Sequence, residues 1–200
     1  MDAVACFVGA LAGAKGCSQL NALLARGISA SASIEMPENV LQGIMYISST
    51  DLVKAHEHSI MISERTGQPA GFNTNVANTL GGMFTALGQD VSNVHESAVS
   101  HWGLKQRPLD VGGGIIATMH IPSLVIGTRG GATELPTQRE CLQLIGCEGE
   151  GKVLRLAEII AAYSLALDIS TYSAVSAGYF AEAHDNLGRN RPTEEPAPNK

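Results

Sequence analysis

The segment that most constrains the fold is GFNTNVANTLGGMFTALGQDVSN, which runs from Gly71 to Asn93. Its large apolar residues recur at helical spacing, so one face of a helix is predicted to lie in the core. These residues are Phe72, Val76, Leu80, Met83, Phe84 and Leu87. Gly81 and Gly82 cost the middle of such a helix about 1 kcal/mol each relative to alanine. The pair therefore predicts that another backbone or a ligand passes close to the helix.

Polar residues mark both ends of this helix. Asn73, Asn75 and Asn78 crowd its first turns, although asparagine is a poor helix former. Gly88 is predicted to end the helix. Asp90 follows just past the negative end of the helix dipole, which disfavours a carboxylate. Asp90 therefore either has a function or caps the next turn, and the helix alone favours neither interpretation.

Length and composition indicate one soluble globular domain. The 200 residues are enough for one sizeable core, and 44% hydrophobic with 16% charged residues is typical of soluble proteins. The net charge of −6 argues against nucleic acid or an anionic membrane surface as a partner. The four cysteines have neither CxxC nor zinc spacing, which predicts reduced thiols in a cytoplasmic protein and no metal site.

The two ends of the chain have different characters. The apolar start, AVACFVGALAGA, lacks a basic region and is too short to span a membrane, so Ala3 to Val8 is predicted to be a strand. Residues 191–200 are rich in proline and charge, which predicts a disordered polar tail. Because no internal repeat or long linker interrupts the chain, we expect a single domain over residues 1–190.

Further elements follow from periodicity and turn residues. Strands are predicted at Ser29–Pro37 and Gly114–His120, and the second continues at Leu124–Gly127 after a break at Pro122. Helices are predicted at Glu38–Ile47, Asp51–Arg65, Glu134–Ile145 and Lys152–Ala181, and Ser49 or Thr50 is expected to cap the second of them. The segment His95–Trp102 fits a strand or a loop, and Leu104–Asp110 is predicted to be a surface connection. The last helix is apolar almost all round, which predicts burial. Asp168 inside it then needs a partner.

Three other signals each have a plain structural interpretation. His56 and His58 point about 200° apart on a helix, so they cannot share a metal ion. The GTRGGAT segment lies between a strand and a helix, and it fits either an anion-binding nest or a tight turn. Lys15 and His184 would ordinarily be solvated side chains.

Several motifs together resemble the 3-hydroxy-3-methylglutaryl-coenzyme A (HMG-CoA) reductase family. ARGISASASIEMP resembles its RG segment and the following strand, and GFNTNVAN with GQD resembles its central helix. IPSLVIGTRGGATELPTQRECLQLIGC resembles a long family signature, and SLALDISTYSAVSAGYFAEAH with HDNLGR resembles its last helix and catalytic-histidine flap. The resemblance covers nearly the whole chain. It implies an α+β fold, a trimmed large domain around a buried central helix.

The resemblance also implies roles for individual residues. Lys15, Asp90 and His184 match the family's catalytic lysine, aspartate and histidine, so Lys15 is expected to polarise a substrate carbonyl while His184 exchanges a proton. His184 would close over the ligand from a mobile segment. We expect the substrate site to include Asn21, Asn75, Asn78, Arg129, Gly130, Gly131 and Arg189. The family builds its site between subunits, which implies a homodimer.

The departures from the family concern the cofactor. No part of the sequence matches the family's small nucleotide domain, its DAMGMN-type nicotinamide motif or the amino-terminal half of its large domain with the catalytic glutamate. PENVLQG is similar to the motif around that glutamate but follows the RG strand instead of preceding it, so Glu38 is not given the role. Arg129 stands where the family has a small apolar residue. We therefore expect no cofactor and no measurable NADPH binding.

These expectations favour a cofactor-independent acid–base enzyme. It would cyclise, isomerise or eliminate from a small carbonyl-bearing or polyene-like molecule of specialised, polyketide or terpenoid, metabolism. Two alternatives stay open. In one, the protein is an HMG-CoA reductase-type NADPH oxidoreductase completed by a partner chain. In the other, it is a non-catalytic pseudoenzyme that pairs with a full-length reductase.

Overall fold

The computed structural model describes residues 24–66 and 72–187. The predicted strand Ala3–Val8, the predicted site residues Lys15, Asn21 and Arg189, and the predicted tail 191–200 lie outside these ranges. The described elements, in chain order, are β1 (Ile28–Met36), α2 (Glu38–Val40), η1 (Leu41–Met45), α3 (Ser49–Arg65), α4 (Val76–Ala86), η2 (Val91–Asn93), α5 (Val94–Ser97), β2 (His101–Gln106), η3 (Leu109–Val111), β3 (Ile115–Leu124), η4 (Gly131–Glu134), α6 (Pro136–Leu144), α7 (Val153–Ser176) and α8 (Phe180–Leu187). The predicted α+β class is confirmed.

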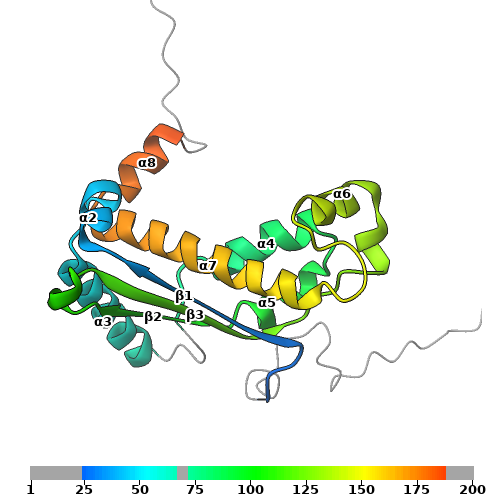
Figure 1. Ribbon diagram of the computed structural model, residues 1–200, viewed down its shortest axis with the longest axis horizontal. Helices are drawn as coiled ribbons and strands as arrows, with labels where there is room; N and C mark the ends of the chain where they lie inside the picture. Colours follow the sequence, from blue (N-terminus) through cyan, green and yellow to red (C-terminus); the bar gives the residue numbers. More distant parts are fainter. Residues whose placement is uncertain (1–23, 67–71, 188–200) are drawn as a thin grey trace, which may run out of the picture.

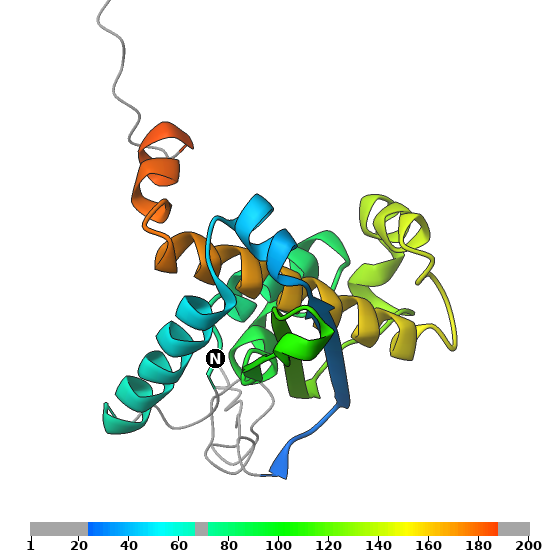
Figure 2. The same cartoon turned by 60° about the vertical axis from the view of Figure 1, so that its left-hand side comes forward.

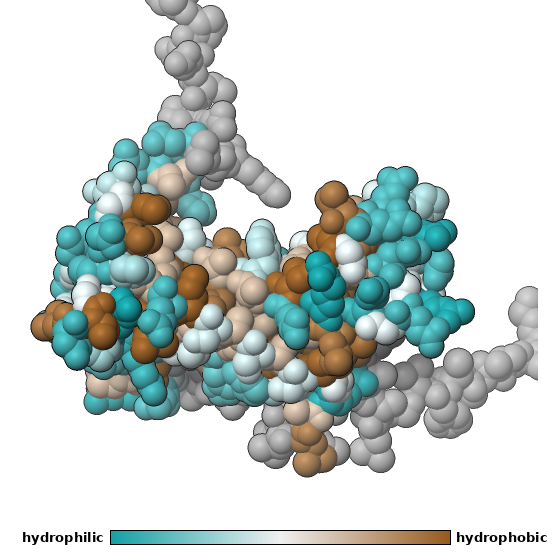
Figure 3. All heavy atoms as spheres, viewed as in Figure 1, coloured by the Kyte–Doolittle hydropathy of each residue, from teal (hydrophilic) through white to brown (hydrophobic). Residues whose placement is uncertain are grey.

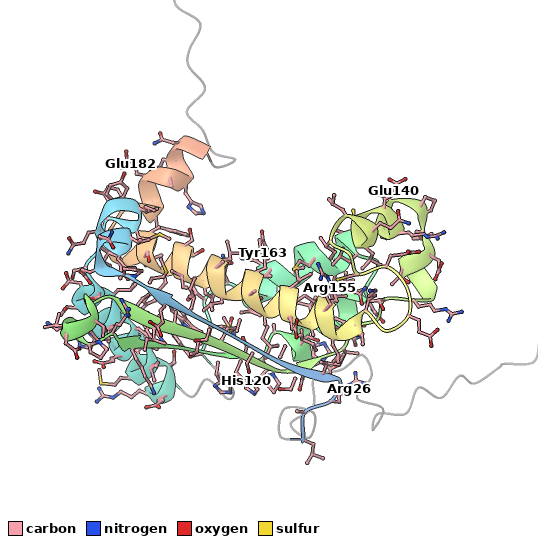
Figure 4. The ribbon with its side chains drawn as sticks, in the orientation of Figure 1. Arg26, His120, Glu140, Arg155, Tyr163 and Glu182 are labelled. Carbon is pink, nitrogen blue, oxygen red and sulfur yellow. The ribbon has the colours of Figure 1, made fainter. Side chains whose placement is uncertain are left out.

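A small antiparallel sheet supports the helices, with β3 between β1 and β2 (Figure 1). Alternate residues of β3 are buried from Ile115 to Ile121, whereas Thr118 and His120 on its other face are exposed. This alternation is the pattern of a sheet with one face against a core. Helix α7 packs on the buried face along β1 and β3. Figure 4 shows His120 on the side of the sheet away from α7.

The strands extend further than the sequence pattern predicts. Pro122 does not interrupt β3, which continues to Leu124. It lies beyond His120, the last β3 residue paired with β2, and the pairing with β1 is irregular between Ile28 and Ala30. A proline can occupy such a place because its missing N–H removes little from the ladder. Part of the predicted surface connection 104–110 belongs to β2, whose alternate residues Trp102 and Leu104 are buried.

The predicted long helix Lys152–Ala181 is two helices. Helix α7 ends at Ser176, Gly178 adopts a positive φ of 81°, and α8 begins at Phe180. Only one face of α7 is buried in the described part of the chain, since Leu154 is 64% and Tyr163 53% exposed. Tyr163 projects from α7 away from the sheet (Figure 4). Apolar side chains accordingly remain on the surface between α8 and α6 (Figure 3).

Helix α4 has the predicted core face, with Val76, Leu80 and Phe84 fully buried. Gly88, with a φ of 67°, follows its end as expected. Within the described chain no other backbone passes close to the glycine pair, because a Cβ atom on Gly81 or Gly82 would meet nothing within 4 Å. The predicted alternative, a ligand beside the pair, stays a prediction. The closely packed glycine is instead Gly88, where a Cβ atom would lie 2.4 Å from the carbonyl oxygen of Ala132.

The amino-terminal helices also differ in detail from the prediction. The segment predicted as one helix over Glu38–Ile47 is the short helix α2 followed by a π-helical turn, and Tyr46 adopts a positive φ of 54° where that turn ends. The cap of α3 is Ser48, not Ser49 or Thr50, because the Ser48 hydroxyl accepts a hydrogen bond from the backbone N–H of Asp51 at 3.1 Å.

A buried histidine joins α3 to the sheet. His56 contacts the rings of Phe72, Trp102 and Tyr172 edge-on, and its Nε2 lies 3.3 Å from the carbonyl oxygen of Trp102. Burial lowers the pKa of His56, although the Trp102 carbonyl and the Glu57 carboxylate oppose this effect. The surrounding aromatic rings offer nothing to stabilise a second ring N–H, so the neutral imidazole is the form that the core accommodates.

We expect the free energy of unfolding to fall as the pH drops below about 6.5, the pKa of an unfolded histidine. Between the lowered folded pKa and that value, the unfolded state binds more protons, so stability rises with pH. His56 contributes at most one proton, or about 1.4 kcal/mol per pH unit. Urea denaturation between about pH 5 and pH 8 measures this slope. His56→Gln should flatten it, whereas His58→Gln, at an exposed position of the same helix, should leave it unchanged. Equal slopes in the two variants would contradict the assignment.

Candidate functional site

One cavity of the described chain lies between the end of α4 and the loop that follows β3. It has a volume of about 550 Å³. Four predicted site residues line it together: Asp90, Arg129, Gly130 and Gly131. Its other lining residues are Gly88, Gln89, Val91, Asn93, Val125, Ile126, Gly127, Ala132 and Thr133. The GQD turn and the GTRGGAT loop therefore form one site, although they are separated by about 40 residues in the sequence.

Asp90 occupies the rim of this cavity and also caps a turn. Its Oδ1 accepts hydrogen bonds from the backbone N–H of Ser92 at 3.0 Å and from the Ser92 hydroxyl at 2.7 Å. The capping interpretation is therefore correct. It does not exclude a function, because a carboxylate has about four acceptor positions on two oxygens. The cap fixes the carboxylate at the cavity instead of leaving it to rotate in solvent.

The glycine loop offers its backbone to the cavity. Gly130 and Gly131 have positive φ angles of 82° and 59°. A Cβ atom on either of them, or on Gly127, would meet nothing within 4 Å. The N–H of Gly130 donates to a carboxylate oxygen of Glu134 at 3.0 Å. The loop is thus a tight turn into η4, held by the Glu134 carboxylate, and its binding of an external anion stays a prediction.

Arg129 supplies a cation at the same cavity. Its Nη1 lies 2.9 Å from a carboxylate oxygen of Glu150, and both side chains are largely exposed. Exposed pairs of this kind contribute about 0–1 kcal/mol. Arg129 can therefore exchange Glu150 for an anionic ligand at little cost.

The predicted residues Asn75 and Asn78 lie at the amino-terminal end of α4, whose 11 residues make it about 16 Å long, whereas Asp90 follows its other end. The Asn75 amide donates to the Thr171 hydroxyl at 3.0 Å, and the Asn78 amide donates to the Asn75 side-chain oxygen at 2.5 Å. Neither residue lines the Asp90 cavity. The predicted substrate residues therefore divide between the two ends of the central helix.

Asp168 holds the amino-terminal end of α4. Its fully buried carboxylate accepts hydrogen bonds from the backbone N–H groups of Thr74 at 3.0 Å and Asn75 at 2.7 Å. Burial raises the pKa of Asp168, and the two N–H donors oppose this by stabilising the charged form. The partner that the sequence required is thus the positive end of a helix.

His184 lies in α8, and the predicted mobility of this segment stays a prediction. Its Nδ1 is 3.0 Å from the carbonyl oxygen of Phe180, and the two rings are 4.1 Å apart. Helix α8 projects from the end of α7 that is remote from α6 (Figures 1 and 2). The described residues therefore bring together Asp90 and the glycine loop, and His184 is not part of that cavity.

Gln89 is the site residue that sequence reasoning missed. It is 9% exposed and its side chain bonds to the backbone of the glycine loop. The only signal was its place between Gly88 and Asp90 in the GQD motif. Among the residues that the structure describes, no cluster of three metal-ligating side chains occurs, and no helix is long and apolar enough to cross a membrane.

The mixed helices and small antiparallel sheet are consistent with an α+β HMG-CoA reductase domain. The chain belongs to this family, since the family model described as hydroxymethylglutaryl-coenzyme A reductase matches residues 2–189. A 3-hydroxy-3-methylglutaryl-coenzyme A reductase of Methanocaldococcus jannaschii is 32% identical over 172 residues, which are 86% of this chain and 42% of that protein. The reductase of Aeropyrum pernix is 33% identical over 175 residues, and that of Schistosoma mansoni 31% over 174. The chain thus spans less than half the length of these relatives.

These relatives correct the expected reaction. They carry the name of a reductase, so the expectation of a non-redox cyclase, isomerase or lyase is wrong. The expectation of no cofactor is wrong for the same reason, because a reductase needs a source of electrons. The names of these relatives do not support a place in specialised metabolism. The absence of a nicotinamide motif from this chain does not show a loss of redox chemistry, because the chain spans less than half the length of these relatives.

We expect Asp168→Ala to lower the free energy of unfolding by about 2 kcal/mol, because two backbone N–H groups at the start of α4 lose their buried, charged acceptor. Chemical denaturation near neutral pH measures the loss. Ser170→Ala, at an exposed position of the same helix, is the matched control and should change stability by less than about 0.5 kcal/mol. Equal stability of the two variants would mean that Asp168 does not anchor α4.

Proposed function

We propose that this chain contributes to an HMG-CoA reductase-type, NADPH-dependent oxidoreductase. It supplies the aspartate and the glycine loop of the site, and other segments of the same or a partner polypeptide supply the rest. The observation that carries the proposal is the shared cavity: Asp90 faces a loop whose Gly130 N–H already binds a carboxylate. Family membership supports the reaction class.

The cavity has features that fit part of a dinucleotide. The open space beside Gly127, Gly130 and Gly131 lets a flat or branched ligand approach the backbone closely, which a side chain would prevent. Arg129 and the Gly130 N–H would hold an anionic group, and Glu134 and Glu150 would be the groups displaced. When bound, the cofactor supplies a hydride.

The chain's own residues then have distinct tasks. Asp90 is proposed to hold or move a proton beside the substrate carbonyl, a task that contributes about 10²- to 10⁴-fold in enzymes that use it. Lys15 and His184 are the other two catalytic residues that the family resemblance implies. Because His184 lies outside the Asp90 cavity of its own chain, it would have to act there from another subunit. Asn75 and Asn78 are proposed to contact substrate at the far end of α4.

Asp90 should be needed for turnover and dispensable for folding. We expect Asp90→Asn to reduce HMG-CoA-dependent NADPH oxidation by about 10²-fold or more. The assay uses the protein alone, and mixed with the separately produced part of the Methanocaldococcus jannaschii relative that this chain does not match. Asp110→Asn is the control, because Asp110 is exposed and lies outside the cavity. The proposed function is refuted if the wild-type protein, both alone and in the mixture, neither binds NADPH nor oxidises it in the presence of HMG-CoA.

We also propose that the protein is a homodimer. The resemblance places the family site between subunits, and the exposed apolar face of α7 favours burial against another surface. Light scattering at micromolar concentration should give twice the mass of the chain. Tyr163→Glu, on that exposed face, should shift the mass toward one chain, whereas Glu158→Gln at an exposed charged position of α7 should not. A monomer in the wild-type protein would contradict the proposal.

A further inference from the structure

The side chain of Gln89 makes a two-sided contact with the start of the glycine loop. Its Nε2 donates to the carbonyl oxygen of Gly127 at 2.8 Å, and its Oε1 accepts from the backbone N–H of the same residue at 2.8 Å. The Nε2 also donates to the carbonyl oxygen of Leu87 at 2.9 Å. The amide thus pairs with Gly127 as a neighbouring strand would, and it ties that residue to the end of α4.

Only one orientation of the amide satisfies these contacts. If its oxygen and nitrogen were exchanged, the oxygen would face the carbonyl oxygens of Leu87 and Gly127, and the NH₂ group would face the Gly127 N–H. Three favourable contacts would become three repulsive ones. Because the side chain is almost fully buried, water cannot relieve such a mismatch.

A second contact holds the far end of the loop. Gly88 packs so closely on the carbonyl of Ala132 that a Cβ atom would lie 2.4 Å from its oxygen. Residues 88 and 89 therefore touch the loop at both of its ends, at residues 132 and 127. The next residue along the chain is Asp90. The carboxylate and the loop are fixed to one another through this short segment.

We propose that Gln89 is a positioning residue that sets Asp90 against the Gly130 N–H, so that both face the same bound molecule. The catalytic part of this inference rests on the function proposed above. A displacement of about 1 Å at such a site can cost about 10²-fold in rate. In this proposal Gln89 does not contact the reacting atoms. It acts only by holding the Asp90 carboxylate and the Gly130 N–H in a fixed position relative to each other.

Two substitutions test the contact between the Gln89 side chain and Gly127, and both change the volume of the side chain little. Gln89→Met removes both the donor and the acceptor. Gln89→Glu keeps the acceptor for the Gly127 N–H, but an ionised carboxylate faces two carbonyl oxygens. Protonation restores one donor, so the Gln89→Glu protein should recover toward wild type as the pH is lowered, and Gln89→Met should not. Gln143→Met, at an exposed glutamine of α6, is the control.

The first measurement is hydrogen exchange at the backbone amide of Gly127, which needs no activity. We expect exchange at least about 10-fold faster in Gln89→Met than in the control, with the core amides of β3 unchanged. The second is steady-state kinetics with HMG-CoA and NADPH, in which kcat should fall about 10- to 100-fold while KM changes less than about 3-fold.

The outcomes separate the two proposals. Faster exchange together with a kcat loss and pH-dependent recovery in Gln89→Glu supports the positioning role. Two outcomes overturn the positioning role and leave the proposed reductase function intact. In the first, the Gly127 amide of Gln89→Met exchanges at the wild-type rate. In the second, it exchanges faster but kcat does not change. If the wild-type protein neither binds NADPH nor reduces HMG-CoA, the proposed function fails, and the catalytic role of Gln89 fails with it. If Gln89→Met does not fold, the Gln89→Glu comparison across pH decides by the same criteria.

Discussion

The structure depends on the contact between a buried carboxylate and the start of the central helix. Asp168 lies within the apolar face of α7, where an unpaired charge would be costly. The N–H groups of Thr74 and Asn75 pay for this burial by supplying two hydrogen bonds at the positive end of α4. This interaction joins the two main helices at the amino-terminal end of α4.

The core could be predicted from the sequence because periodicity reports burial directly. The apolar face of α4, its end at Gly88 and the strand β1 all follow from residue spacing and turn chemistry. The break at Gly178 was missed because alanine and serine around it continue a helical pattern. The exposed face of α7 was not predicted either. An apolar composition indicates that a helix can be buried, but it does not show which of its faces other parts of the described chain cover.

The candidate site was only partly predictable, and for a different reason. Asp90 and the glycine loop could be named from motifs, but the motifs do not show that Asn75 and Asn78 lie outside the cavity that Asp90 lines. Gln89 was missed because a buried glutamine gives no periodic signal. Its role depends on meeting the backbone of Gly127, a contact between residues far apart in the chain.

Anchoring α4 at one end and placing Asp90 just beyond the other makes the length of this helix a critical dimension. Each residue in a helix adds about 1.5 Å and turns the next side chain by about 100°. A single deletion or insertion between Asn75 and Gly88 would therefore swing the GQD turn around the helix axis while Asp168 held the opposite end. Substitutions on the solvent side of α4 leave this geometry intact. The segment should accordingly tolerate changes of residue type far better than changes of length.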